Sequence, residues 1–419
     1  MMTNSISFSY LSSGWLVFTA TPKAHLLLPI FMFLISACQP NNARPKEEVS
    51  FSIMAYYVPE RDYQPESLPL DQLTHIIFSF SKVIDGEMGF SNEEAGKKLH
   101  MLVGQKQNHP HLKVMLACGG WGAGGFSDMS VTAEGRSKFV QSTIRMIEKY
   151  QLDGIDMDWE YPALDYAGID AREEDTQNFT LLMKELREEL DKLDRPQTLT
   201  FASAGWKYYY EKIELNEVMK YADYMNVMTY DQVGASLPYT GHHTALGTID
   251  DADVQDQPIY NYYQQRNAVA KEQGREAYEI HSVKSIVAYC LEQGVDPQQI
   301  VIGGAFYGRA WKGVPPENNG LYQPNQGAFI GWSSYRDIRE QYENKNGYIR
   351  YWDESAEAPY LYNLTDSIFF SYDDTASVRL KTQYAIEKDL GGIMFWQLGN
   401  DTKQEDSLLD AIFEAAQSK

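Results

Sequence analysis

Eight apolar runs alternate with amphipathic helical patterns from residue 51 to the end of the chain, and this alternation restricts the fold more than any other feature. Alternating strands and helices form a parallel sheet covered by helices, and eight such units can close into a barrel. We therefore predict a protein of the α/β class with a (β/α)8 TIM barrel. The predicted strands are Phe51–Val58, Leu73–Phe80, Leu112–Cys118, Asp153–Asp158, Thr198–Ala204, Ala222–Thr229, Gln299–Ala305 and Gly392–Trp396.

Five of the intervening or following segments carry apolar residues at the spacing of an amphipathic helix. They are Val131–Tyr150, Glu173–Leu193, Ser282–Gln293, Thr375–Leu390 and Glu405–Ala416. An open, doubly wound sheet is the competing arrangement, and it is expected to have a glycine-rich turn after its first strand. Here the first strand runs into Tyr56-Tyr57-Val58-Pro59, which favours the closed barrel.

One stretch interrupts the alternation between the seventh strand and its helix. Residues 312–367 are rich in Tyr, Trp, Asn, Gly and Pro and contain short alternating runs such as Gly347–Trp352. A structureless loop of this length is uncommon in a compact domain. We therefore predict a small inserted α+β subdomain here, beside the mouth of a barrel formed by residues 50–311 and 368–419.

The N-terminal region has the features of a targeting segment. The apolar run Leu26–Ser36 is too short to cross a bilayer but fits the apolar region of a signal peptide. It leads into Ile35-Ser36-Ala37-Cys38, which resembles a bacterial lipobox, and residues 39–49 form a polar tether. We predict a lipoprotein signal peptide over residues 1–38, lipidation of Cys38, and secretion to the bacterial cell envelope. The alternative is an ordinary cleaved signal with a chance cysteine.

Composition excludes some classes of partner. The formal net charge of −22 argues against nucleic acid and anionic membrane surfaces as partners, since both attract basic patches.

The sequence predicts neither a disulfide framework nor a metal site. Besides Cys38 the chain contains only Cys118 and Cys290, which cannot form a disulfide framework and have no zinc-ligand spacing. His242 and His243 are adjacent but lack a helical HExxH motif or a third ligand, so we predict no metal site.

The segment that carries chemistry is Asp153-Gly154-Ile155-Asp156-Met157-Asp158-Trp159-Glu160. Side chains alternate faces along a strand, so Asp156, Asp158 and Glu160 share one face. The opposite, apolar face belongs under the helices, and the three acids must therefore point into the barrel with Glu160 at its mouth. Buried carboxyl groups are costly unless protonated or hydrogen-bonded, so a functional site is expected here.

The one-sided placement of the acids restricts the reaction. A conventional retaining glycosidase places its acid and its nucleophile on opposite sides of the anomeric carbon. A single strand cannot do this, so the nucleophile comes from a second strand or from the substrate, whose 2-acetamido oxygen can attack while Glu160 protonates the leaving oxygen. Asp156 and Asp158 should share a proton, and crowding and burial should raise the pKa of Glu160.

The acidic segment resembles the signature of glycoside hydrolase family eighteen, the chitinases. That signature is D-x-x-D-x-D-x-E, and here it is matched by Asp153, Asp156, Asp158 and Glu160, followed by Tyr161-Pro162. Further segments resemble other motifs of this family over essentially the whole chain from Phe51. They are Leu116–Trp121, Asn226–Asp231, Gly241–Thr244, Phe306–Trp311, Tyr372–Asp374 and Gly392–Trp396.

The resemblance implies roles for individual residues. Glu160 would be the general acid and then the base, Asp158 would orient the acetamido group, and Asp156 would hold the shared proton. Tyr230 would donate a hydrogen bond to the acetamido oxygen. The implied substrate-binding residues are Tyr56, Trp121, Tyr161, Met228, Asp231, Arg309 and Trp396, with Trp396 as the floor under the distorted sugar. The implied reaction is hydrolysis of chitin or chito-oligosaccharides with retention, without cofactor, metal or obligate protein partner.

One position departs from the family pattern. The motif on the third strand usually begins with a serine whose hydroxyl supports the deeper aspartate, and here that position is Ala117. Asp156 thereby loses a hydrogen-bond donor, which should disfavour its charged form. We expect a shifted pH optimum and slower turnover, but not inactivity.

Three other functions fit parts of the sequence. An endo-β-N-acetylglucosaminidase acting on glycoprotein glycans, or an enzyme acting on peptidoglycan, would share the acidic strand but should lack the insertion, which favours linear chains. A chitin-binding lectin on the same barrel would have lost the catalytic glutamate, whereas Glu160 is present. A surface adhesin is supported only by the predicted lipid anchor.

Overall fold

The computed structural model describes residues 51–59, 64–234, 236–272, 279–404 and 406–418. Eight parallel strands form a closed barrel, because β1 pairs with β14 on one side and with β2 on the other. Around the barrel the order is β1, β2, β4, β5, β6, β7, β8 and β14. Their bounds are β1 Ser52–Tyr57, β2 His75–Ile84, β4 Lys113–Gly119, β5 Gly154–Asp158, β6 Thr198–Ala204, β7 Tyr224–Met228, β8 Ile300–Ala305 and β14 Gly392–Trp396. The predicted (β/α)8 TIM barrel is therefore confirmed, and each predicted strand overlaps one barrel strand.

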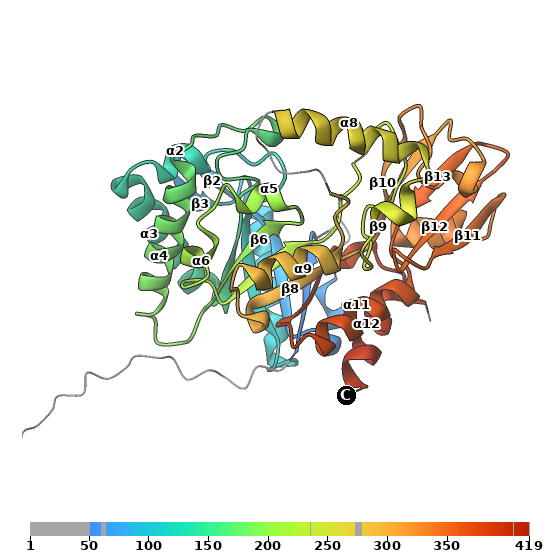
Figure 1. The fold of residues 1–419 in the computed structure, drawn as a ribbon. Coiled ribbons are helices and arrows are strands. Elements are labelled where there is room, and N and C mark those ends of the chain that lie inside the picture. Colours follow the sequence, from blue (N-terminus) through green and yellow to red (C-terminus); the bar gives the residue numbers. More distant parts are fainter. Residues whose placement is uncertain (1–50, 60–63, 235, 273–278, 405, 419) are drawn as a thin grey trace, which may run out of the picture. The chain divides into compact units, whose positions relative to one another are not determined.

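Helices surround the barrel, as Figure 1 shows. The longer ones are α1 Glu93–Gly104, α3 Ala133–Tyr150, α4 Asp175–Leu190, α8 Pro258–Glu272, α9 Val283–Glu292, α11 Thr375–Glu387 and α12 Leu408–Gln417. The shorter ones are α2 Phe126–Ser130, α5 Lys207–Tyr210, α6 Leu215–Val218 and α7 Asp251–Val254. Side-chain caps fix several helix starts: Thr132 accepts from the backbone N–H of Gly135 at α3, and Asp374 caps α11. None of the helices in this described part of the chain is long and apolar enough to cross a membrane.

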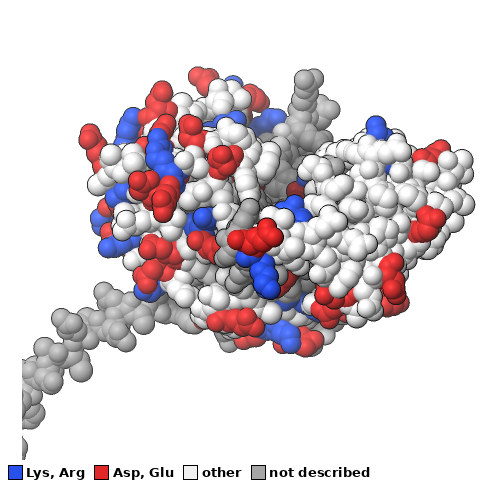
Figure 2. Space-filling model, turned by 45° about the horizontal axis from the view of Figure 1, so that its top comes forward, with Lys and Arg blue, Asp and Glu red and all other residues white. Residues whose placement is uncertain are grey.

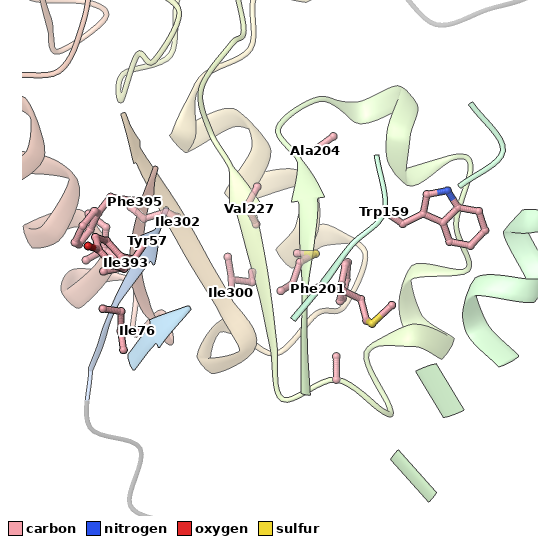
Figure 3. Packing of buried hydrophobic residues seen from close by; sticks show 14 of the residues in the cluster. Tyr57, Ile76, Trp159, Phe201, Ala204, Val227, Ile300, Ile302, Ile393 and Phe395 are labelled. Atoms are coloured by element: carbon pink, nitrogen blue, oxygen red, sulfur yellow. The ribbon is translucent and has the colours of Figure 1, made fainter. Parts of the chain in front are cut away.

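The main hydrophobic core lies between the outer face of the barrel and the helices (Figure 3). Trp159 points from the strand side into this layer, where its ring stacks on Phe126 at a centroid distance of 5.3 Å. A second, smaller apolar cluster fills the inside of the barrel and includes Met54, Met115 and Met394. Successive side chains of each barrel strand therefore point alternately into the outer core and into the barrel interior, and both faces of the strands carry apolar side chains.

An additional sheet interrupts the chain between β8 and α11, as expected for an insertion after the seventh barrel strand. Five antiparallel strands run in the order β10, β9, β13, β12 and β11. Their bounds are β9 Tyr307–Lys312, β10 Ala328–Ser334, β11 Tyr348–Asp353, β12 Ala358–Asn363 and β13 Ile368–Ser371, with the short helix α10 Tyr335–Asp337 between β10 and β11. The sheet thus includes residues on both sides of the range 312–367. The barrel also carries a small antiparallel extension, β3 Glu87–Gly89, which pairs with β2.

The long connection between β7 and α9 contains α7 and α8. The first half of α8 packs on the inserted sheet through Ile259 and Tyr263, which belong to the cluster containing Trp311 and Phe369. Figure 1 shows α8 running along the top of the view from the inserted sheet towards the barrel. Near the end of the connection, Glu279 forms a 2.6 Å ion pair with Lys207, at the start of α5. The connection therefore contacts both the insertion and the loop that follows β6.

Candidate active site

Three carboxyl groups of β5 and the residues after it stand in a column inside the barrel. Asp156, Asp158 and Glu160 are 0%, 4% and 8% exposed, in order from the interior to the mouth. The intervening residues Met157 and Trp159 belong to the outer core under the helices. Strand alternation therefore directs the acids inward, in the direction that the sequence predicts.

Asp156 is the deepest acid, and three other strands supply its hydrogen-bond donors. Oδ1 accepts from the Thr200 hydroxyl at 2.5 Å and from Asn226 Nδ2 at 3.1 Å, and Oδ2 accepts from the Tyr56 hydroxyl at 3.0 Å. Burial raises the pKa of Asp156 to about 6, although all three hydrogen bonds lower it. Ala117 lies beside Asp156 in the β4–β5 register and offers no side-chain donor.

Asp158 lies between the other two acids and is short of partners. Its Oδ1 is buried and accepts no hydrogen bond from the described residues. Burial first, and then the charges of Glu160 and Asp156, raise the pKa of Asp158 well above its usual range. These surroundings therefore favour the protonated form of Asp158, and its carboxyl is available to a ligand.

Glu160 lies at the C-terminal end of β5, where the barrel opens. Burial raises the pKa of this carboxyl to about 7, a hydrogen bond with Tyr161 opposes the shift, and the charge of Asp231 adds to it. A carboxylic acid that keeps its proton near neutral pH is suited to general acid catalysis.

Tyr230 follows β7 and brings a hydroxyl into the same space. It is 8% exposed, and its only hydrogen-bond partner among the described residues is the Met394 sulfur, at 3.8 Å. Gly303 on β8 leaves room for the ring, because a Cβ there would lie 2.9 Å from Tyr230 Cε1. Burial raises the pKa of Tyr230 well above 10, so the hydroxyl remains a donor.

An aromatic floor faces the acids from the opposite wall. Trp396, at the end of β14, is partly buried and stacks on Phe80 at 5.5 Å with an interplanar angle of 21°. Tyr56 lies 6.0 Å from the same indole. Met228, at the end of β7, is also partly buried and packs against the interior cluster. Since β5 and β14 are four strands apart in an eight-stranded ring, the indole lies across the mouth from Glu160.

Asp231 and Arg309 form an ion pair between the barrel and the insertion. Arg309 Nε donates to Asp231 Oδ1 at 2.5 Å, and Arg309 Nη1 donates to the Gly331 carbonyl on β10. Hydrogen bonds from His243 and Arg309, together with the charge of Arg309, hold the pKa of Asp231 below its usual range despite burial. Asp231 therefore stays charged near the mouth.

The loops after β4, β5 and β6 carry further aromatic rings. Trp121 is 67% exposed, and its ring lies 6.4 Å from that of the buried Tyr161. The inserted sheet contributes the exposed Trp332, which stacks beside Tyr307 at 6.3 Å. Figure 2 shows that the inserted lobe presents few charged residues on this side, whereas the barrel presents charges of both signs.

The two adjacent histidines have acidic partners. His242 Nε2 lies 3.0 Å from Asp353 Oδ2, and His243 Nδ1 lies 3.7 Å from Asp231 Oδ1. Both side chains are buried and connect the loop after β7 to the insertion and to the Asp231–Arg309 pair. In the described residues no group of three His, Cys, Asp or Glu side chains is arranged to hold a metal ion.

The structure brings together all the predicted residues that it describes; Cys38 lies outside the described residues. It also adds Thr200, Asn226 and Phe80, which sequence analysis did not single out. Thr200 and Asn226 each stand as a polar residue within a buried strand, and that pattern could have indicated their inward orientation. Nothing local distinguishes Phe80, which lies under Trp396 only because β2 and β14 both flank β1.

Comparison with known proteins places this site in a family. A family model described as glycosyl hydrolases family 18 matches residues 52–401. Chitinase A1 of Niallia circulans is 38% identical over 310 residues, which are 71% of this chain and 42% of that protein. Chitinase B of Serratia marcescens is 30% identical over 391 residues, which are 82% of this chain and 77% of that protein.

Solved structures agree with these matches. A family 18 N-acetylglucosaminidase from Paenibacillus barengoltzii superposes with a TM-score of 0.76 at 36% identity and covers 87% of this chain and all of its own. Chitinase ChiA74 from Bacillus thuringiensis superposes with a TM-score of 0.77 at 28% identity, over 88% of this chain and 70% of its own.

Proposed function

This chain belongs to the glycosyl hydrolases of family 18, and from that premise we propose that it is a chitinase that hydrolyses the β-1,4 bonds between N-acetylglucosamine units. The chitinases among its relatives support this substrate class. The observation that carries the proposal is the one-sided acid column: Asp156, Asp158 and Glu160 all project from β5.

A one-sided column leaves the nucleophile to be supplied by the substrate. Among the described residues outside the column, Asp231 is the carboxylate whose charge acts on Glu160. The Arg309 guanidinium binds Asp231 in an ion pair. Asp156 is bound by Thr200, Asn226 and Tyr56 at the bottom of the column. The attacking group is therefore the carbonyl oxygen of the substrate's own 2-acetamido group, a recognised exception to the use of two carboxyl groups.

The reaction follows from the two facing walls of the mouth. One sugar rests on Trp396, and the bond to be broken points across the barrel towards Glu160. Glu160 gives its proton to the glycosidic oxygen while the amide oxygen bonds to the anomeric carbon, and the leaving chain departs as an alcohol. Water then attacks the same carbon, loses a proton to Glu160 and displaces the amide oxygen. Two inversions give net retention.

The remaining groups of the site stabilise the charge that develops on the amide. Tyr230 donates its hydroxyl hydrogen to the amide oxygen, and Asp158 accepts a hydrogen bond from the amide N–H as positive charge grows on the bridging ring. The proton of Asp158 passes towards Asp156, which the hydrogen bonds from Tyr56, Thr200 and Asn226 prepare for this exchange. The pKa of Glu160, about 7, keeps its proton available near neutrality.

The test compares Glu160→Gln with wild type on chitohexaose. We expect turnover to fall by a factor on the order of 10⁴, because general acid and base catalysis are both lost, while hexamer binding is retained. Glu188→Gln, on the exposed side of α4, is the matched control and should retain wild-type turnover. Near-normal turnover in Glu160→Gln would refute the proposal.

The role of the amide is tested with a second substrate. A reporter glycoside of cello-oligosaccharides has hydroxyl groups where chitin has acetamido groups. Wild-type enzyme should hydrolyse it at a negligible rate, and NMR of the chitin products should show the β-anomer first. Equal rates on both substrates would mean that a protein carboxylate is the nucleophile.

An N-acetylglucosaminidase that releases single sugars is the second candidate, because the Paenibacillus barengoltzii structure at 36% identity is described as such an enzyme. Product analysis on chitohexaose distinguishes the two: monosaccharide alone indicates the second candidate, and oligosaccharides indicate a chitinase. A high-mannose glycopeptide in the same assay tests the endo-β-N-acetylglucosaminidase alternative, and binding without any product would indicate a lectin.

We further propose that the enzyme acts at the outside of a bacterial cell, held by a lipid on Cys38. The support is the lipobox-like run before Cys38 in the sequence. Metabolic labelling with a radioactive fatty acid should mark the wild-type protein but not Cys38→Ala. Equal labelling of the two would contradict the anchor.

A further inference from the structure

Two aromatic side chains outside the residues considered so far form a pair next to Tyr161. Tyr166 follows β5, and Trp206 directly follows β6, at the start of α5. Their ring centroids lie 6.3 Å apart with an interplanar angle of 35°. Tyr166 is 41% exposed and Trp206 is partly buried, so both rings present surface to solvent. We call this pair the Tyr166–Trp206 platform.

The platform joins the proposed active site through one residue. Tyr161, the neighbour of Glu160 in the chain, contacts Trp206 edge-on at 5.0 Å and Tyr166 at 6.4 Å. Trp121 contacts Tyr161 at 6.4 Å, and no ring contact joins it to the platform in the described structure. The rings therefore offer two separate surfaces, Trp121 and the platform, with Tyr161 between them.

The position of the platform determines which part of a substrate could reach it. Trp396 stands on β14, and the loops that carry Trp121, Tyr161, Tyr166 and Trp206 follow β4, β5 and β6 on the opposite side of the ring. In the proposed reaction the sugar over Trp396 is attacked, and Glu160 protonates the oxygen of the leaving chain. The leaving chain therefore extends over the loops of β4 to β6.

A buried network holds the loop that bears Tyr166. The Asp175 carboxylate, at the start of α4, is 0% exposed and accepts from the Ser127 hydroxyl at 2.8 Å and from the Arg172 backbone N–H at 2.7 Å. Arg172 Nη1 donates to the Ser127 hydroxyl at 2.6 Å, and its Nη2 pairs with Asp128. Since Ser127 follows β4 and Arg172 follows β5, this network fixes the two loops to each other.

A polar pocket adjoins the platform. Its lining includes Asp165, which directly precedes Tyr166, and Glu211 and Lys212, which follow α5. Arg172, Glu173 and Thr176 also line it. Sugar sites combine a ring that covers the apolar face of the sugar with polar groups at its edge. The platform and this pocket together supply both.

We propose that the Tyr166–Trp206 platform and its pocket bind a distal sugar of the leaving chain of a chito-oligosaccharide, beyond the sugars next to the cleaved bond. This proposal rests on the proposed chitinase function. It makes the enzyme favour long linear chains, because a short substrate does not extend to the platform. Asp175 is a positioning residue for this site, since it acts through the loop of Tyr166.

The experiment measures two substrates with one set of variants. Chitohexaose extends to the platform, whereas 4-methylumbelliferyl chitobioside has only the reporter group beyond the cleaved bond. In Tyr166→Ala/Trp206→Ala we expect the ratio of the hexamer KM to the reporter KM to rise about tenfold, which matches the loss of one or two stacking contacts. Trp206→Phe keeps a ring and should give a smaller rise, which separates stacking from misfolding.

Met101→Ala is the control. Met101 is an apolar side chain on α1 that is 46% exposed and lies outside the loops that carry the platform and its pocket. Its KM ratio should stay within about twofold of wild type. A platform variant with an unchanged ratio would overturn the proposal, and so would an equal rise for both substrates, which would mean that the rings act through Tyr161.

A direct binding measurement tests the platform independently of the proposed chitinase activity. The dissociation constant of chitohexaose is measured by calorimetry in the Glu160→Gln background, with and without the platform substitutions. About tenfold weaker binding supports the platform even if the reporter is not hydrolysed, in which case only the proposed chitinase function fails. Equal affinity overturns the platform while leaving the chitinase proposal intact.

Discussion

The Tyr56 hydroxyl, on β1, donates a 3.0 Å hydrogen bond to Oδ2 of Asp156, on β5, across the inside of the barrel. The charge at the bottom of the acid column is thus controlled by a residue far away in the chain and by the closure of the barrel itself. Thr200 and Asn226 contribute in the same way from β6 and β7. The charged form of the deepest carboxyl is stabilised because three other strands direct hydrogen-bond donors to it.

Tyr56→Phe tests this dependence. The substitution removes a donor to the charged form, so the pKa of Asp156 should rise above its value of about 6. In the proposed mechanism activity is lost when the Asp156–Asp158 pair gains its second proton. The acidic limb of the kcat/KM profile should therefore move to higher pH, by about half a unit to one unit for one hydrogen bond. An unmoved acidic limb would show that this hydrogen bond does not set the titration.

Ala117→Ser should shift the same limb in the opposite direction. The position is the direct neighbour of Asp156 in the β4–β5 register, and a serine there supplies an additional donor. The pKa of Asp156 should fall, so activity should persist to lower pH. The pH–rate profile measures this, and no change in either limb or in turnover would refute it. Ala55→Ser, on the outer face of β1, is a buried control that introduces the same hydroxyl outside the acid column.

Glu160→Gln should stabilise the fold in a pH-dependent way. The folded-state pKa of Glu160 is raised from 4.5 to about 7, so its protonated form stabilises the protein below pH 4.5 and this contribution is lost as pH rises through 7. Glutamine carries no charge to desolvate. At about pH 8 the variant should be more stable than wild type by up to about 3 kcal/mol, and the difference should shrink towards pH 4.5. Urea unfolding at both pH values measures it; a constant difference would contradict the linkage.

The buried ion pair of Lys381 and Asp373 gives a stability prediction. Both side chains are 0% exposed, and Lys381 Nζ lies 2.6 Å from Asp373 Oδ2 and 2.6 Å from the Thr244 hydroxyl. Lys381→Met leaves a buried carboxylate without its cation and should cost about 3–5 kcal/mol. Lys381→Met combined with Asp373→Asn should recover most of this loss.

The control for this prediction is Lys184→Met, which breaks the exposed pair of Lys184 with Glu188 and should cost less than about 1 kcal/mol. Denaturant midpoints of the three variants provide the comparison. If the double variant were as unstable as the single one, packing of the lysine stem rather than its charge would be responsible.

The periodicity of the sequence was sufficient to predict the barrel and to predict that the three acidic side chains point into it. Two-residue alternation determines which face of a strand a side chain occupies, so the inward column of Asp156, Asp158 and Glu160 could be predicted without any knowledge of neighbouring strands. The donors to Asp156 could not be predicted in the same way, because Thr200 and Asn226 meet it only through the register of β5, β6 and β7.

The edges of the insertion were less predictable. β9 begins at Tyr307 and β8 ends at Ala305, so only Phe306 separates a barrel strand from a strand of the inserted sheet. The helix α8 gave no periodic signal because only Ile259 and Tyr263 are buried along it. Trp206 likewise follows a strand with no local mark of its pairing with Tyr166, which depends on two loops from different strands.

The inserted sheet shares its apolar residues with the barrel, and this has a consequence for how such enzymes can diverge. Tyr335, Ile338, Leu361 and Phe370 belong to the same continuous core as the barrel strands and helices. A variant could not lose the lobe by deletion alone, because the deletion would expose apolar residues of the outer layer to solvent. Removal of the lobe would therefore require accompanying polar replacements along that layer, whereas exchange of its surface loops would require none.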